Sequence, residues 1–188
     1  MRIAICGPPG SGKTTVCALV ANHFGYDYVL VGQVFRQMAI ERKMDLESFG
    51  RLAEENETID RELDERMLAI ALSRGDIVME GRLTGALLKS RKIPVFAVFI
   101  NAEEQVRAER IARRESREVE SVLREMQSRE RSEKKRYFAY YGINPYNESI
   151  YDLRVDSTSQ SAESVAEAIV DKIRKAMDED ARQVKGKR

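Results

Sequence analysis

The chain has 188 residues, which is enough for one domain that buries a core without disulfides or metals. Hydrophobic residues make up 43% and charged residues 34%, a profile typical of a globular protein with a heavily charged surface. The formal net charge of +1 excludes attraction of the whole molecule to nucleic acid or to an anionic membrane, so any anion site must be local.

Strands and helices alternate from the first residues onward. Strands are predicted at 2–6, 26–31, 76–80, 93–100 and 152–156. Helices are predicted at 13–24, 32–74, 103–141 and 161–177, with further helix starts at Asp45 and near Glu57. This order predicts an α/β fold, a five-stranded parallel sheet with helices on both faces and with strand 93–100 near its middle.

The helical stretches 32–74 and 103–141 are longer than crossovers over five strands require, so we expect two helical excursions from a single domain of residues 1–178. The tail 179–188 has no apolar face and is expected to be disordered. No signal peptide opens the chain and no apolar run reaches membrane-spanning length, so we expect a cytoplasmic protein. Cys6 and Cys17 lack metal-ligand spacing and are interpreted as buried free thiols.

The stretch "GPPGSGKT", residues 7–14, follows the first strand and opens the first helix. It matches G-x-x-x-x-G-K-[ST], in which glycines let successive backbone N–H groups point at phosphate oxygens. Lys13 should reach the β and γ phosphates, and the Thr14 hydroxyl can hold Mg²⁺. We therefore expect a P-loop NTPase fold with ATP and Mg²⁺ as cofactors. The predicted ATP-binding residues are Gly7, Pro8, Pro9, Gly10, Ser11, Gly12, Lys13, Thr14 and Thr15. The alternative is a glycine-rich turn that binds no ligand.

Other P-loop classes lack their signatures here. The chain has no N-K-x-D base-reading motif of a GTPase and no L-S-G-G-Q motif of a transporter ATPase. A small kinase remains, with its second substrate in the crevice beside the P-loop.

Two arginines mark that crevice. Arg36 follows Gly32 in "VGQVFR", and Arg82 follows Gly81 in "EGRLTG", each just after a predicted strand. Ligands of open parallel sheets bind outside the carboxyl ends of the strands, so both side chains can face the same anion as Lys13. Taken singly, each could instead be a solvated surface arginine.

Two further arginine patterns fall on the predicted helix 103–141. One helix face carries, at spacings of 4, 3, 4, 3 and 4, the residues Val122, Met126, Arg129, Glu133, Arg136 and Tyr140. This stripe turns from apolar to ionic, so it either lines a ligand site or forms an exposed salt-bridged face. The segment "RAERIARRE" places several arginines within reach of one polyphosphate, or along a solvated face: Arg107, Arg110, Arg113 and Arg114.

The chain resembles the nucleoside monophosphate kinases, and most closely the cytidylate kinases of the compact archaeal type. The resemblance covers nearly the whole chain. It rests on "GPPGSGKTT", on "VGQVFR" for an S-G-x-x-[FY]-R segment, on "EGRLTG" for D-G-R-x-x-G, on "RERSEKKR" for R-x-x-x-[DE]-x-x-R, and on "VDSTSQSAESV" near the end.

The resemblance implies roles for individual residues. Those implied to bind the acceptor monophosphate or its surroundings are Arg36, Gly81, Arg82, Gly85, Arg129, Glu133 and Arg136. Those implied to be catalytic are Lys13, Arg110 and Arg113, with Arg107 or Arg114 as further members of a lid at 107–119. Residues 156–158 would lie beside the donor base, and segment 32–74 would bind the monophosphate.

Three departures from the family pattern affect these roles. Val31 replaces a serine, and Glu80 replaces an aspartate that could act through water on Mg²⁺. The large insertion of the bacterial enzymes is missing, and residues 45–74, which include Asp60, Arg61 and Asp64, stand in its place. The residues that read the base therefore cannot be transferred from the family.

We expect phosphorylation of CMP and dCMP by ATP in a monomeric enzyme that binds neither nucleic acid nor membrane. A kinase for AMP or UMP, or for a small metabolite such as shikimate or dephospho-coenzyme A, is the nearest alternative. A P-loop regulatory ATPase that acts on nucleic acid is a third. It would need a basic surface, whereas residues 101–140 carry eleven basic and nine acidic side chains. His23, the single histidine, lies mid-helix and is not expected to be catalytic.

Overall fold

The computed structural model describes residues 1–185 and contains a five-stranded parallel sheet in the order β2-β3-β1-β4-β5. The strands are β1 (Arg2–Cys6), β2 (Asp27–Leu30), β3 (Ile77–Glu80), β4 (Phe96–Asn101) and β5 (Leu153–Asp156). This confirms the predicted fold class. The apolar strand β4 pairs with β1 on one side and β5 on the other, so it lies inside the sheet, as expected from its composition.

The helices follow the start and stop signals of the sequence. They are α1 (Lys13–Phe24), α2 (Val31–Glu41), α3 (Leu46–Glu55), α4 (Glu57–Ser73), α5 (Thr84–Ser90), α6 (Glu104–Glu115), α7 (Val119–Tyr141) and α8 (Ala162–Lys185), with a 3₁₀ turn at Glu148–Ile150. The Asp45 carboxylate accepts from the Ser48 N–H at 2.8 Å and caps α3. Gly25 and Gly142 end α1 and α7 in the left-handed conformation.

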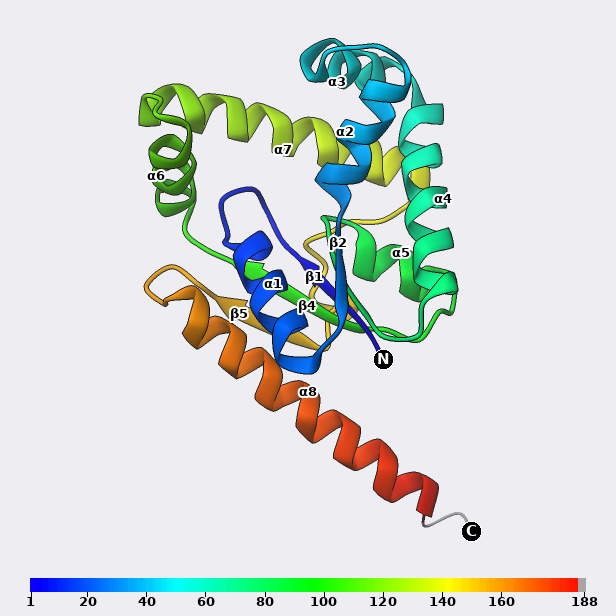
Figure 1. Cartoon of the computed structure of the whole chain (residues 1–188). Coiled ribbons are helices and arrows are strands. Elements are labelled where there is room, and N and C mark those ends of the chain that lie inside the picture. The colour runs from blue at the N-terminus through cyan, green and yellow to red at the C-terminus, as the bar shows by residue number, and fades with distance from the viewer. Residues whose placement is uncertain (186–188) are drawn as a thin grey trace.

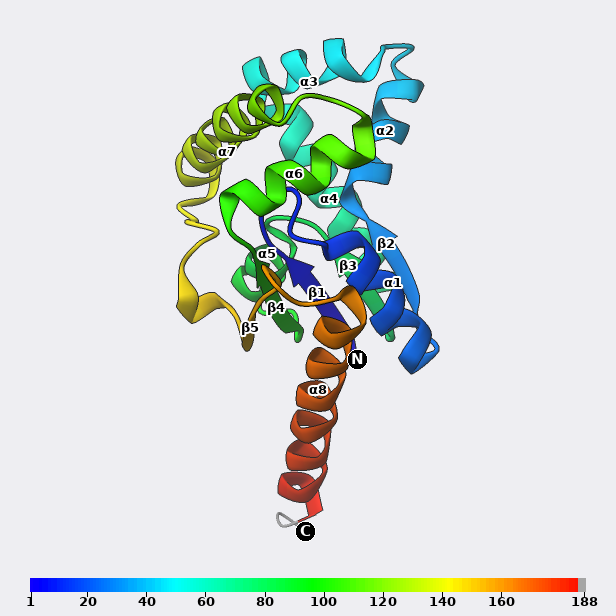
Figure 2. The same cartoon turned by 90° about the vertical axis from the view of Figure 1, so that its left-hand side faces the viewer.

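The sheet is covered on both faces (Figure 1). On one face, Ile3 and Ile5 of β1 pack with α1 and with Val165 and Ile169 of α8. On the other face, Ala4 and Cys6 alternate with these residues and belong to a cluster with Phe99 and Tyr151, while α4 and α5 pack beside it over β3. Figure 2 shows α8 extending away from the sheet towards the C-terminus.

Two helical excursions rise above the carboxyl edge of the sheet (Figures 1 and 2). The excursion α2–α4 has its own apolar cluster, in which Met38 and Phe49 are fully buried. The excursion α6–α7 is held together by Ala108 and Ala112 against Val122 and Met126. The space above the P-loop therefore lies between two separately packed helical units.

The structure corrects three boundaries. Helix α5 was not predicted, because seven residues are too few to show a helical period. Helix α2 begins at Val31, so Gly32 lies inside the helix and does not end β2. Helix α8 continues beyond 177 to Lys185, because no glycine or proline interrupts the chain before Gly186. The expected disordered tail is thus helical as far as 185, and residues 186–188 lie outside the described part.

Both cysteines are buried and free, as predicted. Cys6 Sγ accepts from the Gly85 N–H at 3.3 Å. Desolvation raises the pKa of both thiols to about 12. Along residues 1–185, no helix has both the length and the apolar character needed to cross a membrane.

Candidate active site

The P-loop connects β1 to α1 in a conformation that requires glycine. Gly7 and Gly10 have φ angles of 145° and 77°. A Cβ on Gly7 would lie 2.1 Å from Ile100 O, and one on Gly10 would lie 2.5 Å from Arg107 O. The loop is therefore fixed against β4 and α6, and α1 begins directly after it without a side-chain cap, an arrangement suited to an anion.

Lys13 is buried at the start of α1, with 7% of its surface exposed. Its Nζ donates to Pro8 O at 2.7 Å and lies 3.8 Å from Glu80 Oε1. Desolvation lowers the pKa of Lys13 to about 8, although the Glu80 carboxylate favours the charged form. A phosphate group would supply the charge partner that this ammonium only partly has.

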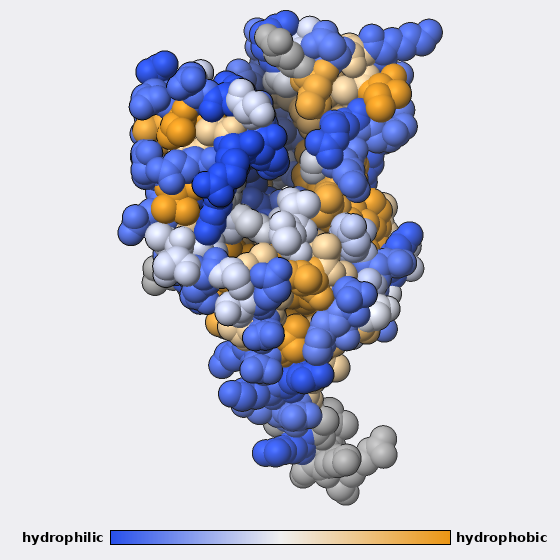
Figure 3. Space-filling view, turned by 60° about the vertical axis from the view of Figure 1, so that its left-hand side comes forward, coloured by the Kyte–Doolittle hydropathy of each residue, from blue (hydrophilic) through white to orange (hydrophobic). Residues whose placement is uncertain are grey.

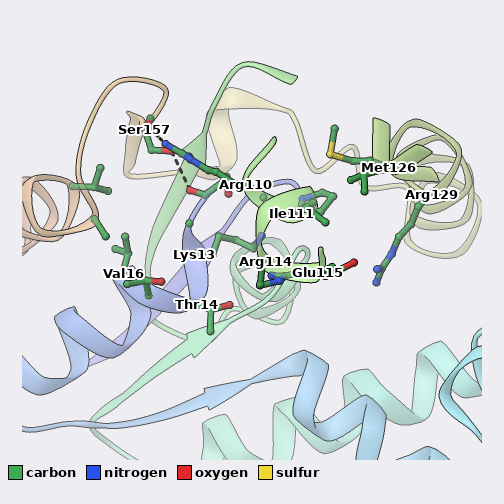
Figure 4. Close-up of a pocket in the computed structure, with 18 of the residues that line it drawn as sticks. Lys13, Thr14, Val16, Arg110, Ile111, Arg114, Glu115, Met126, Arg129 and Ser157 are labelled. Carbon is green, nitrogen blue, oxygen red and sulfur yellow. Dashed lines mark hydrogen bonds and ion pairs between the residues drawn. The ribbon is translucent and has the colours of Figure 1, made fainter. Parts of the chain in front are cut away.

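A cavity of about 540 Å³ opens above the P-loop. Figure 4 shows Lys13 and Thr14 below it, Arg110 and Arg114 of α6 beside it, and Arg129 on α7 across from them. Figure 3 shows the surface hollowed between the α6–α7 side and the α2–α3 side, with hydrophilic side chains around the hollow. The cavity therefore joins the phosphate loop to basic side chains from two other helices.

Arg110 links the P-loop to the loop after β5. Its guanidinium donates to Ser157 Oγ at 3.1 Å and to Ser157 O at 2.6 Å, and Ser157 Oγ donates to Ser11 O at 3.0 Å. Ser157 thus lines the cavity, and it belongs to the segment 156–158 that the resemblance implies beside the donor base.

A second charged cluster lies at the end of β3. Arg82 forms an ion pair with Glu133 of α7, and Glu133 Oε1 also accepts from Arg129 Nε at 3.0 Å. Desolvation lowers the pKa of Arg82 to about 10, and the Arg129 cation adds to this effect, so Arg82 stays charged at neutral pH. A buried cation here suits an anionic ligand that could share or replace Glu133.

The same helix also contacts the other excursion. Arg136 donates to Asp60 Oδ2 of α4 at 2.7 Å and to Ala53 O of α3 at 3.3 Å. Both partners of this ion pair are largely buried, with 16% and 13% of their side-chain surfaces exposed. The ionic stripe of α7 is therefore mostly an internal surface and not an exposed salt-bridged face, although Arg129 itself is exposed.

Comparison with known proteins identifies the family. The model of the cytidylate kinase-like family matches residues 2–159. The chain belongs to this family. It is 41% identical to the cytidylate kinase of Methanopyrus kandleri, over 90% of this chain and 92% of that protein, and 42% identical to that of Archaeoglobus fulgidus, over 90% and 93%. The chain is thus a nucleoside monophosphate kinase.

Solved structures with similar folds include two kinases of small metabolites. The shikimate kinase of Acinetobacter baumannii has a TM-score of 0.63 at 17% identity and covers 93% of each chain. A gluconokinase from Sinorhizobium meliloti has a TM-score of 0.62 at 18% identity, covering 97% of this chain and 96% of that one. At these identities the likeness concerns the fold alone.

The structure of this kinase brings most, but not all, of the expected site residues together. The cavity gathers most of the P-loop with Arg110 and Arg129, and the second cluster gathers Arg82, Glu133 and Arg136. Arg36 is exposed on the first turns of α2, and Arg113 is exposed and does not line the cavity. The roles of all the expected site residues, these two arginines included, stay predictions.

Two glycines act by close packing. A Cβ on Gly81 would lie 2.3 Å from Thr84 Oγ1, and one on Gly85 would lie 3.0 Å from Ala97 Cβ. They allow the turn after β3 and helix α5 to pack tightly, and this packing fixes the backbone on either side of Arg82.

Arg107 has a structural position that the sequence did not indicate. It is buried, donates to Ala102 O at 3.0 Å and to Pro9 O at 3.1 Å, and pairs with Glu130 of α7. Arg117, which was not predicted, lines the cavity. For α6 the signal was present in the sequence, since Arg107, Arg110 and Arg114 are spaced 3 and 4 apart and share one helix face, whereas Arg113 does not. Arg117 lies in the turn between α6 and α7, where helical spacing gives no signal.

Two side chains beside the P-loop offer oxygens of the kind that magnesium ions bind. Among the side chains that the structure describes, no three Asp, Glu, His or Cys residues lie together as ligands for a metal ion. Thr14 offers a hydroxyl in the cavity, and the Glu80 carboxylate lies beside Lys13. Mg²⁺ usually binds through one or two protein oxygens plus phosphates and water, so this donor set fits it.

Proposed function

We propose that this kinase transfers the terminal phosphoryl group of ATP to CMP and to dCMP, producing ADP and the nucleoside diphosphate. Membership of the cytidylate kinase-like family supports this proposal. The observation that carries it is the pair of adjacent charged sites along α7: the P-loop cavity, which Arg129 lines, and the buried cluster around Arg82 and Glu133. A kinase with two phosphorylated substrates needs two such sites.

In this mechanism the P-loop N–H groups and Lys13 hold the β and γ phosphates of ATP. The acceptor phosphate binds Arg82, and Glu133 moves aside or turns to a ribose hydroxyl. An acceptor phosphate is already an anionic nucleophile at neutral pH, so the reaction needs positioning and charge stabilisation and no strong general base. Arg110, Arg114, Arg117 and Arg129 surround the place where charge develops.

Thr14 and Glu80 are the residues that would hold Mg²⁺ against the ATP phosphates. The ion would neutralise phosphate charge during transfer. The excursion α2–α4, expected at 32–74, would hold the monophosphate. The junction of α6 and α7, with the expected lid at 107–119, would close over ATP and exclude water, which would otherwise accept the phosphoryl group.

The kinase is further proposed to act as a cytoplasmic monomer that binds no nucleic acid. Its large exposed apolar side chains come from seven separate segments of the described chain: Tyr28, Ile40, Leu46, Leu72, Phe138, Tyr146 and Met177. Residues scattered in this way do not by themselves form a subunit interface. Light scattering coupled to gel filtration should give the mass of one chain.

An acceptor panel tests the reaction. Phosphoryl transfer from ATP, with and without Mg²⁺, should be measured to CMP, dCMP, UMP, AMP, GMP, shikimate and dephospho-coenzyme A, with a reaction lacking any acceptor. Dominant turnover of CMP and dCMP that needs Mg²⁺ is expected. Turnover mainly of AMP or UMP would keep the phosphate sites and refute the base assignment. Hydrolysis without a productive acceptor would refute the kinase proposal.

A further inference from the structure

Arg107 contacts the P-loop without lining the cavity above it. Its Nη1 donates to Pro9 O at 3.1 Å, and its Nε donates to Ala102 O at 3.0 Å. The cavity is lined by other arginines of α6, Arg110 and Arg114. Arg107 therefore lies behind the loop, and any effect that it has on a bound phosphate must pass through the loop backbone.

Glu130 of α7 fixes the Arg107 side chain. Nη1 of Arg107 also donates to Glu130 Oε1, and the two side chains are only 7% and 19% exposed. Glu130 Oε2 accepts from Tyr146 Oη at 3.3 Å, and the Tyr146 ring packs edge-on against Phe99 of β4 with ring centroids 5.9 Å apart. The guanidinium is thus tied to α7 and, through Tyr146, to the sheet.

The backbones of the P-loop and of α6 also touch at this point. A Cβ on Gly10 would lie 2.5 Å from Arg107 O and 2.8 Å from Arg107 Cβ. Pro9 and Gly10 both line the cavity on their other side. The peptide unit that joins them is therefore confined between α6 and the cavity.

The contact with Pro9 O determines where the Gly10 N–H points. A trans peptide unit is planar, so the carbonyl of Pro9 and the N–H of Gly10 point in opposite directions. Arg107 holds the carbonyl towards α6, outside the cavity. The N–H is then directed to the opposite side, where a phosphate would bind.

Backbone donors are fewer in this loop than the motif allows. Pro8 and Pro9 carry no N–H, so two of the eight positions of "GPPGSGKT" cannot donate to phosphate. The Gly10 N–H is the first donor after these prolines, and a P-loop binds phosphate largely through such groups. The orientation of this single N–H should therefore affect nucleotide affinity.

We propose that Arg107 is a positioning residue for the donor nucleotide. It holds the Pro9 carbonyl so that the Gly10 N–H donates to a phosphate of ATP, and Glu130 keeps the guanidinium in place. The inference rests on the proposed binding of ATP at the P-loop. It gives Arg107 a role distinct from that of the lid arginines, which would contact the triphosphate directly.

Amide NMR of the full chain with and without ADP tests this role, because donation to a phosphate moves an amide proton signal downfield. Arg107→Met keeps an unbranched side chain and loses the donors. The ADP-induced downfield shift of the Gly10 amide should be lost, and that of Gly12, which also lines the cavity, should remain. The Kd for ADP should rise by at least about tenfold.

Glu104→Gln is the matched control. Glu104 joins the same two helices through an exposed contact, in which its Oε2 accepts from Gln127 Nε2 at 3.0 Å. The control should keep the wild-type shift of Gly10 and the wild-type Kd for ADP, which would separate the role of Arg107 from a general loosening of α6 against α7.

Removal of Arg107 alone leaves the Glu130 carboxylate buried without its cation, which is strongly destabilising. The double variant Arg107→Met with Glu130→Gln removes both charges, and it should fold and show the same loss at Gly10. A Gly10 shift that persists in this variant, or a Kd within about twofold of the wild type, overturns the inference. Loss of the Gly10 and Gly12 shifts together also overturns it, because the whole loop would then have changed. A wild-type protein in which ADP shifts no P-loop amide would instead overturn the proposed function.

Discussion

Arg82 is held beside Glu133 with little access to water, which makes it the most specific candidate for the acceptor phosphate. We predict that Arg82→Ala lowers kcat/KM for CMP by at least about 100-fold, because a buried charge-assisted contact contributes several kcal/mol. The affinity for ATP should barely change. Steady-state kinetics in both substrates checks this.

The matched control is Arg74→Ala. Arg74 makes an exposed ion pair with Asp27 at 2.6 Å, and exposed pairs contribute little. Its kinetics should equal those of the wild type. If Arg82→Ala weakened ATP binding and left the acceptor kinetics intact, the assignment of Arg82 would be wrong.

We predict that Lys13 links ATP binding to proton uptake. Its pKa is lowered to about 8 in the free enzyme, and bound phosphates should raise it again. As pH rises through 8, free Lys13 loses its proton, so ATP binding must restore that proton and the apparent affinity should fall. Calorimetric titrations above pH 8, in two buffers with different ionisation enthalpies, should give different heats. Equal heats would contradict the linkage.

The buried carboxylate of Asp64 should lower the free energy of unfolding at neutral pH. Its pKa is raised from 3.8 to about 6 by burial, so the native state binds more protons than the unfolded state between these values. The free energy of unfolding should therefore decrease as pH rises from about 4 to about 6, by up to about 3 kcal/mol.

The variant Asp64→Asn removes this titration. It should be more stable than the wild type above pH 6 and close to it at pH 4. Urea unfolding at both pH values measures the difference. A variant that is less stable above pH 6 would show that the carboxylate is well paired in the ligand-free protein.

At the scale of elements, two helical glycines should respond to alanine with opposite signs. Gly85 in α5 has Ala97 Cβ at 3.0 Å and Cys6 Sγ at 3.3 Å from a built Cβ, whereas Gly50 in α3 has nothing within 4 Å. Gly50→Ala should stabilise the protein by about 0.5–1 kcal/mol through helix propensity. Gly85→Ala should destabilise it by about 1–3 kcal/mol through overpacking. Thermal unfolding of both variants checks the pair, and a shift of the same sign in both would refute the packing argument.

Elements with a strong local signal were predictable from the sequence. The strands coincide with apolar runs bounded by turn residues, and α1 begins directly after a loop whose glycines match the P-loop motif. Helix α5 carries only seven residues, and its position depends on packing against β1 and β4. The start of α2 at Val31 likewise gave no local signal, because valine suits a strand as well.

Site residues that belong to a sequence motif were predictable from the sequence. Site residues whose direction depends on the rotation of a helix were less predictable. Lys13 and Arg82 are fixed by their neighbours in sequence. Which arginines of α6 face the cavity depends on Ala108 and Ala112, whose burial against α7 sets the rotation of the helix. The contact between α4 and α7 also needed the structure, because Asp60 and Arg136 are 76 residues apart.

At the scale of the whole molecule, α7 connects the cavity above the P-loop with the charged cluster around Arg82. Its first half contributes Val122, Met126 and Arg129 to the cavity, and its second half contributes Glu133 and Arg136 to ion pairs with Arg82 and Asp60. One helix of 23 residues thus carries side chains of both charged regions and contacts α4 of the other excursion through Arg136. If α7 moves as one body, a change at the Arg82 cluster also moves residues that line the cavity.

The two buried thiols can report whether the protein unfolds as one cooperative unit. Cys17 of α1 belongs to the cluster between α1 and α8 on one face of the sheet, and Cys6 of β1 packs with Phe99 and Tyr151 on the other. Neither thiol is reactive while folded, since both pKa values are near 12. A thiol reagent with mass spectrometry should therefore modify both cysteines at one common rate if the two layers separate only in global unfolding. Different rates would identify the layer that opens first. The experiment needs no engineered cysteine.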